Sequence, residues 1–152
     1  MPFDPLDELY QTIILEHSRY PRHYGRIETD NARCIEGYNP LCGDQVGACA
    51  IVSGGRFEAL RCFGQGCAIS KASASLMADT LQGESLERFH ELFSMLQAAL
   101  KGDAAAIAKL EGMGDLAALA GVRHYPARVK CAMLGWQSLK EAVEGKSGTI
   151  QP

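Results

Sequence analysis

Three cysteines and one aspartate stand in three short segments spread over about 90 residues of the chain: Asn39-Pro40-Leu41-Cys42-Gly43-Asp44, Gly64-Gln65-Gly66-Cys67-Ala68 and Arg128-Val129-Lys130-Cys131. Cysteines that a reducing compartment keeps free are more often metal ligands or catalytic groups than disulfides. Three thiolates and one carboxylate suit a four-coordinate zinc ion. If these four side chains bind one ion, the fold must bring three distant segments together.

The chain has 152 residues, of which 47% are hydrophobic, and this is enough for one domain with its own core. A formal net charge of -3 and the lack of a Lys/Arg cluster disfavour nucleic acid as a partner. No apolar run reaches the roughly 18 to 20 residues of a membrane-spanning helix. The start, Met1-Pro2-Phe3-Asp4-Pro5, lacks the pattern of a secretory signal. We therefore expect a cytoplasmic protein without a nucleic-acid or membrane partner.

The six cysteines of the chain could in principle form three disulfides, but a cytoplasmic location disfavours that interpretation. For a single cysteine, the most frequent role is that of a small buried hydrophobic residue. We expect that role for Cys49 and Cys62, which lie inside predicted strands, and we expect Cys34 to be an ordinary loop thiol. For Cys42, Cys67 and Cys131 taken together with an aspartate, a metal site is favoured.

The first half of the chain predicts one helix and a small sheet. Asp4-Pro5-Leu6-Asp7 is typical of a helix start, and Tyr20-Pro21 ends the apolar pattern that follows. Residues 22–45 predict a loop with one short strand around 32–38. Two further strands, Val46 to Ser53 and Arg56 to Phe63, flank the hairpin signal Gly54-Gly55.

The second half of the chain has helical periodicity. A helix begins after Gly66, two more are predicted at Ser85 to Lys101 and Asp103 to Glu111, and the last begins at Tyr125-Pro126. This order predicts an α+β fold in which a small antiparallel three-stranded sheet packs on helices. We expect a single domain at residues 1–145 and a flexible C-terminal tail at 146–152.

The local context of the four candidate ligands supports a common site. Gly43 lets Cys42 and Asp44 converge in a tight loop, and the predicted helix N-terminus at Cys67 favours a thiolate there. Three thiolates and a carboxylate around a divalent ion leave a net charge near -2, so the site needs a cationic neighbour. Arg128 lies one helical turn before Cys131 on the same side of the helix and is placed to be that neighbour.

The other motifs are less informative. His17 lies on the apolar face of the first helix and is expected to be a satisfied core group or to face a partner, and the other three histidines lack ligand spacing. The glycines at 64 and 66 are not followed by the GK[ST] signature of a phosphate-binding loop.

A series of motifs occurs in a fixed order between about residues 4 and 144: Leu6-Asp7-Glu8-Leu9-Tyr10, His17, Tyr20-Pro21-Arg22, the Asn39 to Asp44 segment, Gly66-Cys67-Ala68-Ile69-Ser70-Lys71-Ala72-Ser73-Ala74-Ser75 and Tyr125-Pro126-Ala127-Arg128-Val129-Lys130-Cys131. These motifs and their order resemble the NifU/IscU superfamily of iron-sulfur cluster assembly proteins, and within it the SufU-like members. Two features resemble SufU-like proteins rather than the scaffold branch: Lys130 stands where scaffolds have histidine, and the helical segment 84–121 is longer than in scaffolds.

The resemblance implies the SufU/IscU-like fold and a Zn²⁺ ion held by Cys42, Asp44, Cys67 and Cys131. It also implies a zinc-dependent sulfurtransferase that accepts persulfide sulfur from a SufS-type cysteine desulfurase and works with downstream iron-sulfur assembly proteins. Cys42 is the expected sulfur acceptor, because a loop residue leaves a metal at low cost, and Arg128 is expected to assist it by steadying the charge.

Two alternatives use the same ligands. One is a scaffold that assembles a 2Fe-2S cluster, which Lys130 disfavours because a protonated lysine cannot replace a histidine ligand. The other is a purely structural zinc site, which the carboxylate of Asp44 disfavours because structural sites are usually built from cysteine and histidine alone.

Overall fold

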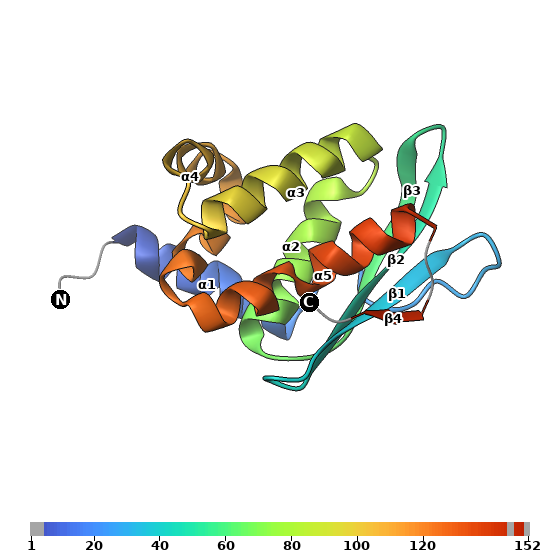
Figure 1. Cartoon of the computed structure of the whole chain (residues 1–152), viewed down its shortest axis with the longest axis horizontal. Helices are drawn as coiled ribbons and strands as arrows, with labels where there is room; N and C mark the ends of the chain where they lie inside the picture. Colours follow the sequence, from blue (N-terminus) through green and yellow to red (C-terminus); the bar gives the residue numbers. More distant parts are fainter. Residues whose placement is uncertain (1–4, 146–147, 151–152) are drawn as a thin grey trace.

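The computed structural model describes residues 5–145 and 148–150, in which one helix precedes a sheet and further helices follow it (Figure 1). This confirms the predicted α+β order. None of the helices in the described part of the chain combines the length and the apolar character that crossing a membrane requires. The elements are α1 (Pro5–Arg19), β1 (Arg33–Asn39), β2 (Asp44–Ser53), β3 (Arg56–Gln65), α2 (Ala68–Leu81), α3 (Leu86–Leu100), α4 (Ala104–Glu111), the 3-10 helix η1 (Gly114–His124), α5 (Pro126–Val143) and β4 (Gly148–Ile150).

The sheet has the strand order β3-β2-β1-β4. Strands β1, β2 and β3 form the predicted antiparallel meander, and positive φ angles at Gly54 and Gly55 make the predicted hairpin turn between β2 and β3. Strand β2 begins earlier than predicted, because Asp44 pairs with Asn39 of β1. Asp44 is therefore the first residue of a strand rather than a loop residue.

Strand β4 was not predicted. Its three residues pair in parallel with residues 35–37 of β1, although they belong to the segment 146–152 that we expected to be a flexible tail. That expectation is wrong for Gly148–Ile150, because the free edge of β1 offers backbone groups that a short extended segment can satisfy. The remaining residues of the predicted tail lie outside the described part of the chain.

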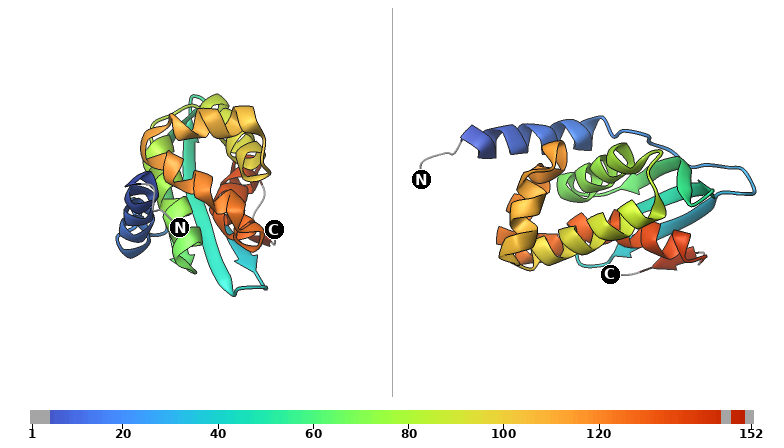
Figure 2. Two further views of the ribbon diagram at one scale, coloured as in Figure 1. Left: turned by 90° about the vertical axis from the view of Figure 1, so that its left-hand side faces the viewer. Right: turned by 90° about the horizontal axis from the view of Figure 1, so that it is seen from above.

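Helices α2 and α5 lie side by side on one face of the sheet, η1 packs against both of them, and α4 packs on α3 and η1 (Figures 1 and 2). A Cβ on Gly135 of α5 would lie only 3.0 Å from the Cβ of Ala74 of α2, so these two helices approach closely. Trp136 is fully buried and donates its indole N–H to Ser73 Oγ at 3.0 Å. This packing fixes the relative positions of the two helices that carry Cys67 and Cys131.

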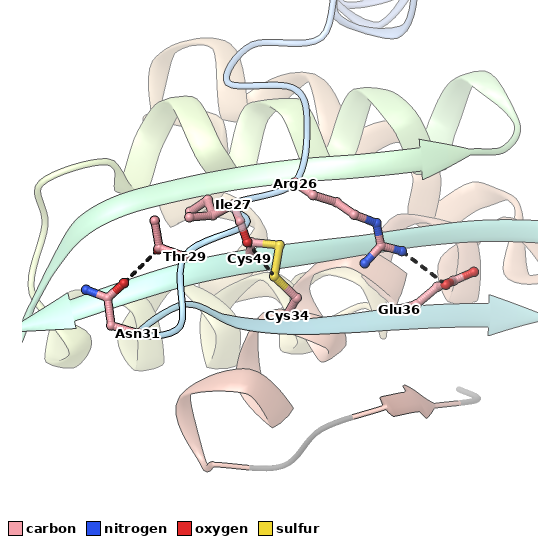
Figure 3. Close-up of a disulfide and its surroundings, with 7 residues drawn as sticks. All are labelled: Arg26, Ile27, Thr29, Asn31, Cys34, Glu36 and Cys49. Atoms are coloured by element: carbon pink, nitrogen blue, oxygen red, sulfur yellow. Dashed lines mark hydrogen bonds and ion pairs between the residues drawn. A yellow bond between two sulfur atoms is a disulfide. The ribbon is translucent and has the colours of Figure 1, made fainter.

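The opposite face of the sheet carries a disulfide between Cys34 of β1 and Cys49 of β2 (Figure 3). This corrects our expectations of a free loop thiol at Cys34, of plain core packing at Cys49 and of fully reduced cysteines. The register decides the pairing, because it places the two residues directly opposite each other. Cys62, in contrast, is free and buried as predicted, and burial raises the pKa of its thiol to about 12.

Candidate metal centre

The four predicted ligands meet where three elements come together. Cys42 lies in the turn between β1 and β2, Asp44 begins β2, Cys67 is the N-cap of α2, and Cys131 lies in the second turn of α5. The ligand atoms of Cys42, Asp44 and Cys131 all lie within 4.8 Å of one another. Cys67 adjoins this group through Asp44.

The contacts of Asp44 link the thiols. Its Oδ2 lies 3.0 Å from Cys42 Sγ and 3.6 Å from Cys67 Sγ, while its Oδ1 accepts the backbone N–H of Cys67 at 2.8 Å. Burial acts to raise the pKa of this carboxyl, but the hydrogen bonds from the Cys42 thiol and the Cys67 N–H outweigh it, so the pKa is lowered. Asp44 is therefore an ionised carboxylate at neutral pH, although it is only 1% exposed.

The N-terminus of α2 orients Cys67. Its Sγ accepts the backbone N–H of Ser70 at 3.5 Å, which places the sulfur where the helix dipole favours a thiolate. Gly66 makes this approach possible, because a Cβ there would lie 2.9 Å from Asp44 Oδ1 and would collide with the Ser70 hydroxyl. Our sequence reasoning gave neither Gly66 nor Ser70 a role at the site, and the only signal was a glycine directly before an N-cap.

Asn39 shapes the turn that presents Cys42. Its backbone oxygen accepts the N–H groups of Cys42 and Gly43 at 3.3 and 2.8 Å, and its Oδ1 accepts the N–H of Leu41 at 3.1 Å. Its side-chain Nδ2 also lies 3.9 Å from Cys131 Sγ, and the residue is 1% exposed. Our sequence reasoning did not assign Asn39 this role, although asparagine before proline is a turn signal.

Cys131 and Arg128 differ in exposure. Cys131 is buried, and that burial, together with the Cys42 and Asp44 side chains, raises the pKa of its thiol. Arg128 is exposed, and its interaction with the Cys131 side chain, followed by that with Cys67, raises the pKa of its guanidinium. Arg128 therefore lies near the Cys67 and Cys131 side chains. Lys130 is also exposed.

His17 is a satisfied core residue and lies apart from the ligands. It is 3% exposed, and its Nδ1 lies 2.7 Å from the hydroxyl oxygen of Ser75, which also accepts the backbone N–H of Arg22. Burial, with a smaller contribution from the Arg22 charge, lowers the pKa of His17. This confirms the prediction of a satisfied core histidine.

The family model described as the NifU-like N-terminal domain matches residues 9–145 of this sequence, which is nearly the whole chain. The chain belongs to the NifU-like N-terminal domain family. The sequence resemblance to iron-sulfur cluster assembly proteins is thereby confirmed.

Two relatives of this NifU-like chain have different names. The iron-sulfur cluster assembly scaffold protein IscU of Streptococcus pyogenes serotype M1 is 33% identical over 144 residues, covering 95% of this chain and 88% of the relative. The zinc-dependent sulfurtransferase SufU of Bacillus subtilis strain 168 is 34% identical over 147 residues, covering 94% and 95%. Because the identities are nearly equal, they support iron-sulfur cluster assembly without choosing between the two roles.

A solved structure confirms the fold of this NifU-like domain. The iron-sulfur cluster assembly scaffold protein of the SUF system from Fervidobacterium islandicum AW-1 superimposes with a TM-score of 0.75 at 28% identity. The match covers 86% of this chain and 93% of that protein. The SufU/IscU-like fold expected from the sequence is therefore the fold of this chain.

Proposed function

We propose that this protein is a zinc-dependent sulfurtransferase that accepts persulfide sulfur from a SufS-type cysteine desulfurase for iron-sulfur cluster biogenesis. The observation that carries the proposal is the difference in exposure among the proposed ligands. Cys42 is exposed on a turn, whereas Cys67 is half-buried and Cys131 is buried, both on helices. One sulfur of the set is thus open to a partner, while the others belong to the packed part of the fold.

The donor set suits zinc. The Cys42 and Cys131 sulfurs and an oxygen of the ionised Asp44 carboxylate lie within 4.8 Å of one another, and the Cys67 sulfur lies 3.6 Å from that carboxylate. Three cysteine sulfurs and one carboxylate are the number and kind of ligands that a tetrahedral zinc site takes. Zinc would supply one chemical property, because it keeps its cysteine ligands as thiolates at neutral pH. That property matters most for Cys131, whose burial otherwise favours the protonated thiol.

Cys42 is the proposed sulfur acceptor. Its thiolate attacks the terminal sulfur of a persulfide on the desulfurase, so that a new S–S bond forms on Cys42 and the S–S bond of the desulfurase breaks. The electron pair of the broken bond leaves with the desulfurase cysteine as its thiolate, and the transferred sulfur remains on Cys42 as a persulfide. Leu41, which is 81% exposed beside Cys42, shows how far this turn projects from the core.

Arg128 is the proposed assisting residue. Its side chain interacts with Cys131 and Cys67, which places a cation beside a set of ligands that would be anionic overall when it binds a metal. A persistent cation at this position stabilises thiolates and lowers the cost of bringing an anionic persulfide to Cys42. Asp44, Cys67 and Cys131 would remain as the anchoring ligands when Cys42 reacts.

A 2Fe-2S scaffold is the second candidate function, and the name of the Streptococcus pyogenes relative supports it. The same three thiols and carboxylate would hold the cluster. Lys130 counts against this function, because a protonated lysine offers no lone pair where scaffold proteins have a histidine ligand.

Metal analysis combined with a desulfurase assay separates these functions. The protein is purified without added iron, its metals are quantified, and the SufS-type desulfurase is assayed with and without it. We expect one zinc per chain, faster desulfurase turnover, and a persulfide on Cys42 by mass spectrometry. A cluster that is transferred to an apoprotein, without stimulation, would establish the scaffold instead. Bound zinc without stimulation or modification of Cys42 would indicate a structural ion.

A further inference from the structure

The Cys34–Cys49 disulfide lies outside the proposed metal centre and has no part in the proposed sulfur transfer. It is on the face of the sheet that points away from α2 and α5, beneath the segment that contains Ile27 (Figure 3). Asn39 and Asp44 are the last pair of the same two strands before the turn, five residue pairs further along than Cys34 and Cys49. For extended strands, this separation between the disulfide and the last pair corresponds to roughly 17 Å. The disulfide therefore lies at the opposite end of the β1–β2 hairpin from the turn that contains Cys42.

The position of this bond allows it to restrain the turn that contains Cys42. It closes a ring of chain that spans 15 positions and includes Asn39, Cys42 and Asp44. On its other edge β1 pairs, within the described residues, only with the three residues of β4. A covalent bond between β1 and β2 therefore restrains the strand whose last residue, Asn39, shapes the Cys42 turn.

The two cysteine residues differ in burial, which favours one of them as the point of attack. Cys34 is half-buried, with its Sγ 3.7 Å from the backbone oxygen of Ile27, whereas Cys49 is 0% exposed. Arg61 of β3 lies directly opposite Cys49 in the register, so that Cys34, Cys49 and Arg61 form one row across three strands. Cys34 is thus the less enclosed of the two cysteines, and a cation on the strand next to Cys49 favours departure of Cys49 as a thiolate.

We propose that Cys34–Cys49 is a reversible redox clamp on the β1–β2 hairpin, opened by a dithiol reductant that attacks Cys34. The attacking thiolate forms a mixed disulfide with Cys34, and the electron pair of the broken bond goes to Cys49, which ends as a thiol with the proton that the attacking thiol gave up. The second thiol of the reductant attacks its own sulfur in the mixed disulfide and releases Cys34. The two cysteines are reduced, and the dithiol is oxidised to its disulfide.

Differential alkylation of the wild-type protein tests the chemistry. The protein is equilibrated with mixtures of reduced and oxidised dithiothreitol, quenched, alkylated and mapped by mass spectrometry. We expect Cys34 and Cys49 to be joined without reductant and to become alkylated together in one reversible transition of the folded protein. A brief exposure to glutathione should place the mixed disulfide on Cys34. Free thiols before reduction, a bond that opens only on unfolding, or an adduct on Cys49 would overturn the proposal.

Thermal unfolding tests the clamp. Reduction should lower the Tm of the wild-type protein by about 6 to 12 °C, as expected for the loss of a bond that closes a ring of this size in a domain of this length. Backbone amides of residues 39–44 should also exchange faster with solvent.

The double variant Cys34→Ala/Cys49→Ala is the control, because it keeps the other four cysteines. Its Tm should not respond to dithiothreitol, whereas Cys62→Ala should keep the full wild-type response. If dithiothreitol lowered the Tm of the double variant as much as that of the wild type, or did not change the Tm of the wild type, the proposed clamp would be overturned. These measurements do not involve sulfur transfer, so their failure is distinct from failure of the proposed function.

Discussion

Cys42 Sγ lies 3.4 Å from Cys131 Sγ, although 89 positions separate the two residues in the sequence. The first belongs to an exposed turn and the second to the buried face of α5. Asn39 connects the two, because it shapes the turn through its backbone and side-chain oxygens and points its amide nitrogen at Cys131. The sulfur of an exposed cysteine on a turn is thus held next to the sulfur of a buried cysteine on a helix.

Cys42→Ala is expected to abolish sulfur acceptance and stimulation of the desulfurase. Because the side chain is exposed on a turn, the Tm of the metal-free protein should change by no more than about 2 °C. The assay is persulfide formation by mass spectrometry together with desulfurase turnover. Cys62→Ala is the matched control, since it removes a buried thiol outside the site and should keep activity. Normal sulfur transfer by Cys42→Ala would contradict the assignment.

Asp44→Asn is expected to weaken metal binding by about 10-fold or more, because it removes the anionic ligand, while the amide oxygen still accepts the Cys67 N–H. Asp44→Ala should in addition leave that N–H without its partner, at a cost of about 1 to 3 kcal/mol in the free energy of unfolding. Competition with a chromophoric chelator measures the affinity, and denaturant unfolding measures the stability. Wild-type affinity in Asp44→Asn would show that the carboxylate is not a ligand.

Gly66→Ala is expected to displace the Asp44 carboxylate or the Ser70 hydroxyl, because the new Cβ would lie 2.9 Å from Asp44 Oδ1. The chelator competition should show weaker metal binding. Gly121→Ala is the matched control, since a Cβ at that position meets no atom within 4 Å. If both variants bind metal as tightly as the wild type, the close approach at Gly66 has no role in the site.

Arg128→Ala is expected to slow persulfide formation on Cys42 several-fold, because it removes the cation that interacts with Cys131. Arg128→Lys should restore part of the rate. Lys130→Ala removes an equal charge two positions away and should leave the rate unchanged. A similar loss in Lys130→Ala would point instead to a general effect of surface charge on docking of the desulfurase.

The free energy of unfolding should decrease as the pH drops below 6.5, and the protonation of His17 should account for part of this decrease. Burial keeps the pKa of His17 below its ordinary value of 6.5 in the folded state. Above pH 6.5 the residue is neutral in both states, so its contribution to stability is complete. Below that pH the unfolded chain takes up a proton that the folded protein excludes, so stability is lost down to the folded pKa.

Denaturant midpoints at about pH 7.5 and pH 5.5 measure this effect. His17→Gln should be less stable than the wild type, because it disturbs the contact with Ser75, but its midpoint should depend less on pH. His90→Gln, which changes an exposed histidine on α3, should keep the wild-type dependence. An unchanged pH dependence in His17→Gln would show that other groups cause it.

The sequence by itself determined the order of α1, the three antiparallel strands and the α-helices that follow them, as well as the Gly54-Gly55 hairpin, and it was enough to propose Cys42, Asp44, Cys67 and Cys131 as one set of ligands. These features follow from local rules: the hydrophobic period distinguishes helix from strand, paired glycines adopt the positive φ angles of a tight turn, and cysteines next to glycines are typical of ligand loops. The spacing of Arg128 from Cys131 on one helix is equally local.

Only the tertiary structure decided the contacts that depend on register and packing. The alignment of β1 with β2 paired Cys34 with Cys49 and made Asp44 a strand residue, and the free edge of β1 allowed β4 to add to the sheet. The sequence pattern does not specify these features, because two strands of known extent still have several possible alignments and long-range packing selects one of them. The same packing buried Cys131 and left Cys42 exposed.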